Sequence, residues 1–409
     1  MKVPLSKPDI GELEIQYVTE VLRNGKLSLG PRLGEFEEKF AAYVGARYAI
    51  ATNSGTSALH LCVRSLGIGS QDEVITTPFS FVASTNCILY EGALPVFVDI
   101  DPITLNIDPK QLRRFLRQCC SLDTKRGALI DKATGRTVKA ILPVHVFGLP
   151  CDMDPIMELA RQYGLIVIED ACEALGGEYR GRRVGTFGDA SAFAFYPNKQ
   201  MTTAEGGMIV TDNEDVARLC RSLRNQGRDE DSSWLRHIRL GYNYRLSDIH
   251  CALGLAQLER IDELLRARER AAVLYNKALV GNPYLTLPSE FDGIQRSWFV
   301  YIVQMNSPAG KTDRDRVLLR LREQGIECQA YFPAIHRQAY LAGNSRAPLG
   351  PLFRTESASD RCIALPFFSS ATEQQIEFVS ETLARILEET LGAAAQAPRV
   401  FTAAASLHQ

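Results

Sequence analysis

Apolar residues in the first half of the chain follow two alternating patterns, one helical and one typical of buried strands. Apolar residues three or four apart predict helices over residues 9–24, 35–43, 58–66, 85–90 and 152–163. Short apolar runs bounded by turn residues predict strands over 48–51, 74–77, 95–98, 140–144, 165–168 and 191–196. Strands that alternate with helices at this interval indicate crossover units. We therefore predict a three-layer α/β domain with a mostly parallel sheet.

The pattern changes after residue 255. A long amphipathic helix, an alternating strand and two further helices are predicted over 257–279, 297–305, 312–324 and 373–391. These elements predict a smaller α+β C-terminal domain over residues 256–391. The large domain then covers residues 1–255, with an N-terminal helix and a glycine-rich loop at 24–34.

Two segments fit neither pattern. Residues 118–137 are polar and poorly patterned, so we expect a surface insertion. Residues 392–409 are rich in alanine and carry no periodicity, so we expect a disordered tail.

Composition narrows the function classes. The chain has 409 residues and a formal net charge of -2, so no general attraction to nucleic acid or to an acidic membrane is implied. No apolar stretch is long enough to span a bilayer and no secretory signal is visible, so we expect a cytoplasmic protein. The 10 cysteines contain no CxxC pair and the 6 histidines no HExxH, so we expect buried thiols and no metal site.

One lysine stands at a position where lysines do chemistry. The stretch FAFYPNKQMTTAEGG, residues 193–207, opens with an apolar run, turns polar, and places Lys199 between this run and a second apolar run. A lysine at the polar end of a buried strand is partly desolvated and loses its proton more easily, and a neutral amine attacks carbonyls. Taken alone, the same spacing also describes a solvated lysine in a hairpin turn.

Three other groups follow predicted strands. The Ser-Gly-Thr-Ser turn at 54–57 opens a helix, so it is either a phosphate cradle or an ordinary N-cap. Phe79 and Phe81 follow the next strand and are either stacking rings or core residues. Asp170 comes directly after the strand over 165–168, in the segment EDACE. In such sheets, ligands bind outside the carboxyl ends of the strands.

Together the four groups specify pyridoxal phosphate. The turn takes the phosphate, the aromatic ring stacks on the pyridine, the carboxylate pairs with the ring nitrogen, and Lys199 holds the aldehyde carbon as a Schiff base. No single group is specific, but their convergence on one sheet edge is.

The chain also resembles the sugar aminotransferases of the DegT/DnrJ/EryC1/StrS family, of aspartate aminotransferase fold type I. The resemblance runs from about residue 4 to about residue 391 and rests on ordered motifs: NGKLSLGP, SGTSALHL, TTPFSFVAS, GALPVFVDID, EDACEALGG, FGDASAFAFYPNKQMTTAEGG and GYNYRLSDIHCALGLAQL. It implies a PLP-dependent aminotransferase.

The resemblance assigns roles at matching positions. Lys199 matches the cofactor lysine and Asp170 the partner of the pyridine nitrogen, while Glu173 matches a position near the ring hydroxyl. The remaining cofactor positions are Thr56, Ser57, Phe81, Asn243 and Arg245, and the substrate positions are Leu29, Tyr331 and His336. Many members carry a serine five residues before the lysine. Here that residue is Ala194, so one phosphate contact is missing or comes from another group.

The resemblance further implies a reaction and an assembly. The amino donor is an amino acid, with glutamate expected, and the acceptor is a keto-sugar linked to a nucleotide. Arg32, Arg228 and Arg245 are candidates for its diphosphate, or are solvated surface charges. A homodimer with shared active sites is implied, in which Asn243 reaches the partner's cofactor. Two alternatives stay open, a non-catalytic regulator of the same fold and another fold type I PLP reaction.

Overall fold

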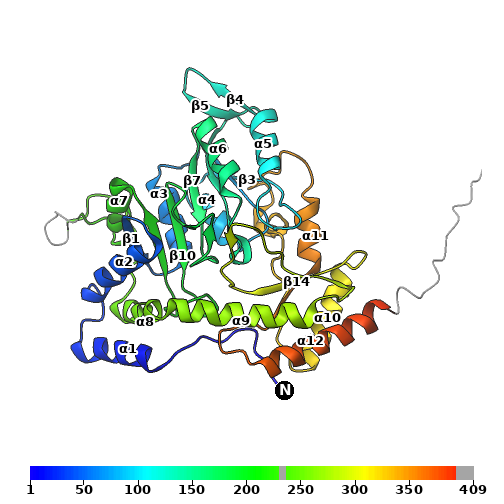
Figure 1. The fold of residues 1–409 in the computed structure, drawn as a ribbon. Helices are drawn as coiled ribbons and strands as arrows, with labels where there is room; N and C mark the ends of the chain where they lie inside the picture. The colour runs from blue at the N-terminus through cyan, green and yellow to red at the C-terminus, as the bar shows by residue number, and fades with distance from the viewer. Residues whose placement is uncertain (230–235, 393–409) are drawn as a thin grey trace, which may run out of the picture.

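The computed structural model describes residues 1–229 and 236–392 and contains one large central sheet (Figure 1). Along its main path the strands lie in the order β1 (Tyr48–Thr52), β11 (Gly207–Thr211), β10 (Ala190–Ala194), β7 (Ile166–Asp170), β6 (Thr137–Leu142), β2 (Asp72–Thr76) and β3 (Leu94–Phe97). Strands β10, β7, β6, β2 and β3 pair in parallel, and β11 is antiparallel to both its neighbours. The predicted mostly parallel sheet is confirmed.

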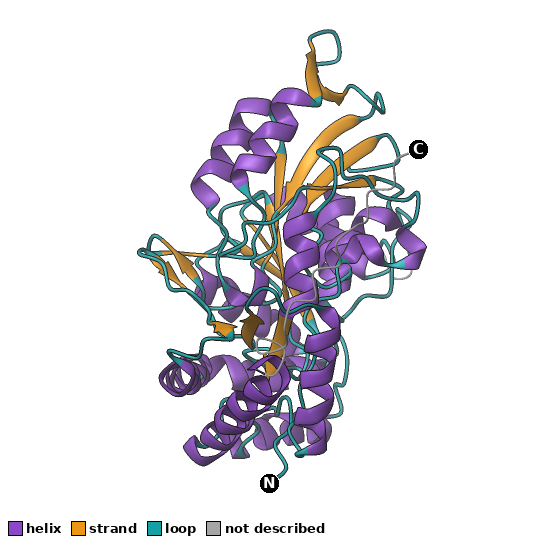
Figure 2. Ribbon diagram, turned by 90° about the vertical axis from the view of Figure 1, so that its right-hand side faces the viewer, coloured by secondary structure: helices purple, strands orange, loops and turns teal. Residues whose placement is uncertain are grey.

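Helices cover both faces of this sheet (Figure 2). One face packs against α3 (Gly55–Ser65), α4 (Ala83–Tyr90) and α7 (Glu214–Arg224). The other face packs against α2 (Pro31–Val44) and α8 (Asp248–Glu259) at one end, and against α5 (Pro109–Gln118) and α6 (Met153–Tyr163) at the other. Successive strand residues serve opposite faces: Ile50 joins the first core, and Ala49 and Ala51 join the second. Helix α1 (Glu12–Asn24) packs outside, on α8.

The expected surface insertion at 118–137 is a regular hairpin. Its strands are β4 (Cys120–Asp123) and β5 (Ala128–Asp131), and β5 pairs with the sheet strand β6 through Ile130 and Thr137. In this hairpin Leu122 is 64% exposed and Asp131 is buried, so the strands lack the apolar alternation by which strands are recognised in a sequence.

The C-terminal part holds a second core. A three-stranded antiparallel sheet of β12 (Leu285–Thr286), β14 (Tyr301–Met305) and β15 (Cys362–Leu365) packs with α9 (Ile261–Leu279), α10 (Lys311–Glu323) and α12 (Glu373–Leu387). Helix α11 (Phe353–Arg361) precedes β15, and a π-helical turn, Glu388–Gly392, follows α12. Val3 also joins this core, although it stands at the start of the chain. We propose 255/256 as the domain boundary. The predicted tail, apart from Gly392, lies outside the described residues.

Short elements complete the fold. A small sheet joins β8 (Glu178–Tyr179), β9 (Arg182–Arg183) and β13 (Ile294–Gln295). Single 3-10 turns lie at Val146–Gly148, Ile335–Arg337 and Ala339–Leu341.

The prediction of a single helix over 257–279 is wrong, because the helix is interrupted at Arg260. Its backbone, at φ -112° and ψ 17°, separates α8 from α9. Its guanidinium is held by Asp9 at 2.6 Å and by Glu14 at 3.4 Å. Apolar spacing continues across this break, so the periodicity alone does not reveal it.

All ten cysteines are unpaired, as predicted, and all but Cys119 and Cys172 are fully buried. Within residues 1–229 and 236–392, none of the helices combines the length and the apolar character needed to cross a membrane.

Candidate active site

A cavity of about 440 Å³ lies where the chain leaves β7 and β10 and enters α3. Most of the predicted cofactor and substrate positions line it: Thr56, Phe81, Asp170, Glu173, Lys199 and Tyr331. These residues are up to 275 positions apart in the sequence, so the parallel sheet brings them together.

Lys199 stands on a tight turn five residues beyond β10. Its backbone N–H donates to the carbonyl of Tyr196 at 2.9 Å. Its Nζ lies 3.8 Å from Glu173 Oε1 and 3.8 Å from the ring centroid of Phe299. The side chain is 13% exposed, so the amine is largely withdrawn from water and faces the cavity.

Asp170 is the last residue of β7. Its N–H donates to Pro143 and its carbonyl accepts from His145, which fixes its backbone. Its Oδ1 accepts a hydrogen bond from the Cys172 N–H at 3.1 Å. Burial raises the pKa of Asp170, while the bonds from Cys172 and the charge of Lys199 oppose this rise. A buried carboxylate of this kind is ready for a cationic or hydrogen-bonding partner.

Glu173 forms the other acidic wall. Its Oε2 accepts a hydrogen bond from the N–H of Phe147 at 2.8 Å. Burial raises its pKa to about 7, although the charge of Lys199 and the bond from Phe147 both favour the ionised form. At neutral pH this carboxyl can therefore hold or release a proton beside Lys199.

The N-terminus of α3 forms the floor of the cavity. The Ser54 side chain caps the helix by accepting from the N–H of Ser57 at 3.1 Å. The Ser57 hydroxyl donates to Asn53 Oδ1 at 2.7 Å. Ser57 is buried and is not among the residues that line the cavity, whereas Thr56 is. Thus both readings of this turn apply: it caps the helix, and it leaves backbone N–H groups at the cavity.

The two phenylalanines after β2 separate into the two roles that the sequence left open. Phe79 is fully buried and packs edge-on against Phe147 at 5.7 Å between ring centroids. Phe81 is 60% exposed and lies on the cavity. Phe81 is therefore available to a planar ligand, and Phe79 is a core residue.

Four predicted positions lie away from this cavity. Leu29 and Arg245 line a separate cavity of about 130 Å³, together with Arg228. Asn243 pairs with Asn225 in an isolated bridge, and its carbonyl accepts from Asn53 at 3.4 Å. His336 lies on a 3-10 turn with its Nε2 3.1 Å from Glu356 Oε1.

Several cavity residues escaped the sequence reasoning, namely Tyr196, Asn198, Glu205, Phe299 and Phe332. Tyr196 and Asn198 belong to the lysine turn, so their nearness to Lys199 was a usable signal. Phe299 comes from the segment before β14, about a hundred residues after the lysine, and local sequence offers no sign of this contact.

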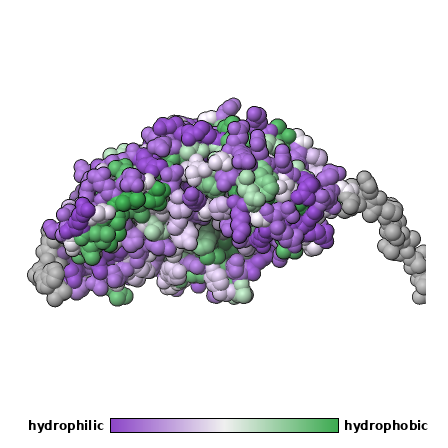
Figure 3. Space-filling view, turned by 90° about the horizontal axis from the view of Figure 1, so that it is seen from below, coloured by the Kyte–Doolittle hydropathy of each residue, from purple (hydrophilic) through white to green (hydrophobic). Residues whose placement is uncertain are grey.

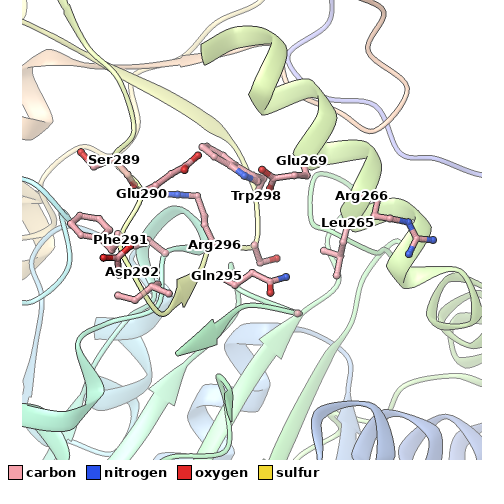
Figure 4. A pocket seen from close by; sticks show the side chains of 14 residues that line it. Leu265, Arg266, Glu269, Ser289, Glu290, Phe291, Asp292, Gln295, Arg296 and Trp298 are labelled. Carbon is pink, nitrogen blue, oxygen red and sulfur yellow. The ribbon is translucent and has the colours of Figure 1, made fainter. Parts of the chain in front are cut away.

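A larger cavity of about 500 Å³ lies against α9 and residues 289–298 (Figure 4). It contains none of the predicted site residues.

The residues of the first cavity fit pyridoxal phosphate. The helix N-terminus suits a phosphate, the buried Asp170 suits a pyridinium nitrogen, and Lys199 suits an aldehyde. The cradle is also tightly built. A Cβ on Gly207 would come 2.4 Å from the Ser54 carbonyl oxygen, and one on Gly55 would come 2.6 Å from the Ala194 Cβ. Glycine at both positions lets the α3 terminus approach β10 and β11.

The fold and this constellation define a PLP-dependent aminotransferase. The family comparison agrees: the model of the DegT/DnrJ/EryC1/StrS aminotransferase family matches residues 8–384, and the chain belongs to this family of sugar aminotransferases. Family members use pyridoxal phosphate, so the predicted cofactor and fold type are confirmed.

Named relatives cover nearly the whole chain. GDP-perosamine synthase of Caulobacter vibrioides is 40% identical over 94% of this chain and 98% of its own. PseC of Helicobacter pylori, an aminotransferase of pseudoaminic acid biosynthesis, is 29% identical with a TM-score of 0.84, over 95% of this chain and 100% of its own. A Streptococcus pneumoniae protein, assigned as a sugar aminotransferase and solved in its PLP form, is 25% identical with a TM-score of 0.84, over 95% and 100% of the two chains.

Proposed function

We propose that this protein moves an amino group from an amino acid, glutamate, to a keto-sugar carried on a nucleoside diphosphate. The observation that carries the proposal is the cavity in which Lys199, Asp170 and the α3 terminus meet. The relatives named for GDP-perosamine and pseudoaminic acid support an amino-sugar product. When bound, pyridoxal phosphate supplies an electron sink that stabilises negative charge on the substrate carbon.

The protein's own residues have distinct tasks in this proposal. The Asp170 carboxylate accepts the pyridine N–H and keeps that nitrogen protonated. The Lys199 amine would bind the cofactor aldehyde and, when free, would carry a proton to and from the substrate carbon as general acid and base. Glu173, 3.8 Å from Lys199 Nζ, steadies this amine. Phe81 stacks on the cofactor ring, while Thr56, and the helix cap in which Ser57 takes part, hold its phosphate.

The acceptor's diphosphate needs cations that the described lining of this cavity does not provide. Lys199 is the one basic side chain among the described residues that line it. The second cavity, by contrast, is lined by Arg221, Arg224, Arg228 and Arg245 together with one acid, Asp229, and Arg224 is already paired with Glu37. A two-fold axis that places this arginine cluster of one subunit against the lysine cavity of another would supply the missing charge. We therefore include a homodimer with shared sites, in which Asn243 and Arg245 act on the partner's ligands.

An exposed apolar face supports an assembly on that side of the molecule. Figure 3 shows apolar side chains gathered on the part of the underside where α1 lies in Figure 1. In α1 and the loop after it, Ile15, Leu22, Leu27 and Leu29 are each at least 46% exposed. Exposed apolar groups that cluster in this way are typical of an interaction surface.

The function is tested with a panel of nucleotide-linked keto-sugars and glutamate, with amino-sugar formation as the readout. At least one acceptor should be aminated, and Lys199→Ala should abolish this. If no acceptor is aminated while glutamate still converts the bound cofactor to its amine form, the acceptor class is wrong but the transaminase assignment stands.

The shared site is tested by complementation. Lys199→Ala and Asn243→Ala are each expected to be inactive. Their mixed dimer carries one site with both defects and one with neither, so mixing should restore activity toward half of normal per dimer. If mixing restores no activity although subunit exchange has been demonstrated, the shared site is refuted.

A further inference from the structure

Behind Lys199 lies a buried arginine that the resemblance does not assign. Arg268 stands on α9 and is 3% exposed. Its Nη2 donates to the backbone carbonyl of Lys199 at 2.6 Å and to that of Asn198 at 3.3 Å. Its Nη1 donates to the carbonyl of Phe299 at 3.1 Å. The Arg268 guanidinium thus binds both the turn that carries Lys199 and the segment that carries Phe299. The Phe299 ring is the one that contacts the Lys199 amine.

The setting of this guanidinium is unusual for a buried cation. Its hydrogen-bond partners are neutral carbonyls, its Nε is buried without a protein partner, and its Cζ lies 5.8 Å from the Phe367 ring centroid. Burial lowers its pKa to about 10, and Asp9 opposes this. Burying a charge whose only hydrogen-bond partners are carbonyls costs free energy. The geometry of those hydrogen bonds has to be good to offset this cost.

The helix that carries Arg268 is fixed on its other side. Figure 4 shows Glu269 beside the Trp298 indole. The following turns of α9 enter the second core through Ala271, Ala272 and Tyr275. Arg268 therefore joins the lysine turn, which follows the large sheet, to a helix rooted in the C-terminal core.

We infer that Arg268 is a positioning residue that sets the backbone of Lys199 and the ring of Phe299 relative to one another. Its planar fork reaches three carbonyls from two chain segments at once, a task that a lysine ammonium performs less completely. If the fork is lost, the three carbonyls lose their donor and the lysine turn can shift. A shift of about 1 Å at a reacting group lowers turnover by about 100-fold. This inference rests on the proposed role of Lys199.

The test compares Arg268→Met, Arg268→Lys and the control Arg270→Met, whose arginine is exposed on the same helix. The readouts are the visible absorption and circular dichroism of bound pyridoxal phosphate, kcat and KM for glutamate, and thermal unfolding. Arg268→Met should change the visible dichroism and lower kcat by about 100-fold, with KM changed much less. Arg268→Lys should fall between it and wild type, and Arg270→Met should match wild type.

Folded Arg268→Met with unchanged dichroism and kcat would overturn the inference. If Arg268→Met does not fold, Arg268→Lys decides: an unchanged spectrum and unchanged turnover refute the positioning role. The role of Lys199 is judged separately, by borohydride reduction and peptide mapping of wild type. If the cofactor is found on Lys199 but the Arg268 variants match wild type in spectrum and turnover, only the inference about Arg268 is refuted and the role of Lys199 stands.

Discussion

Glu173 offers the sharpest test of the site electrostatics, because its carboxyl is buried beside Lys199. Burial raises its pKa from an ordinary 4.5 to about 7. A carboxyl whose pKa is higher in the folded than in the unfolded protein favours folding in its protonated form. That contribution is complete below pH 4.5 and is lost as the pH rises through about 7.

The size of the effect follows from the two values. One pKa unit corresponds to about 1.4 kcal/mol, so ionising this carboxyl costs the folded protein about 3 kcal/mol at high pH. About 2 kcal/mol of this cost falls between pH 5.5 and pH 8.5. Glutamine cannot ionise, and its carbonyl oxygen can still accept the hydrogen bond from Phe147. Glu173→Gln should therefore remove the pH-dependent part and keep the packing.

The assay is urea unfolding of the cofactor-free protein at pH 5.5 and pH 8.5. The free energy of unfolding of Glu173→Gln, relative to wild type, should rise by about 2 kcal/mol between these two values. Glu377→Gln, at an exposed position on α12, is the control and should follow wild type. If wild type and Glu173→Gln lose stability in parallel over this range, the carboxyl is not perturbed as the structure indicates.

Three further predictions concern the cofactor. Purified protein should absorb in the visible, and borohydride with peptide mapping should place the reduced cofactor on Lys199; a different lysine would disprove the assignment. Asp170→Asn should lower turnover by orders of magnitude while thermal unfolding stays close to wild type, because it would remove the charge that we propose faces the pyridine nitrogen; near-normal turnover would contradict this role. Ala194→Ser should tighten cofactor binding by about 0.5–1.5 kcal/mol in equilibrium titrations, through one added hydrogen bond. Weaker binding would instead point to crowding against Gly55, where an added Cβ would come 2.6 Å from the Ala194 Cβ.

The strand ends were predictable because parallel sheets place them along one edge. Asp170 and Lys199 follow apolar runs that the sequence displays plainly, and both line the cavity. The lysine turn, by contrast, depends on long-range contacts. The bond from Arg268 to the Lys199 carbonyl joins residues 69 positions apart, and the arginine looks like one of several charges on an amphipathic helix.

Ser57 shows a different limit of sequence reasoning. A serine at the start of a helix suits both a cap and a phosphate site, and the residue type does not separate the two. In the structure the Ser57 hydroxyl donates a hydrogen bond to Asn53, and Thr56, not Ser57, lines the cavity. His336 is similar, since its Nε2 contacts Glu356 and it does not line the cavity in the described structure.

The two buried carboxyls that line the cavity together with Lys199 suit different partners. Glu173 already has a backbone donor in Phe147 and lies near the lysine amine, so its environment is largely supplied by the protein. Asp170 has the Cys172 N–H on one oxygen, and a carboxylate accepts on both oxygens. The charge of Lys199 opposes the rise in the pKa of Asp170 but does not cancel it, so a cationic ligand would offset the burial further. A pyridinium is such a ligand, so binding of the cofactor should lower the pKa of Asp170 from the raised value of the cofactor-free protein. The burial that raises the pKa of Asp170 should thus strengthen its interaction with a cationic ring.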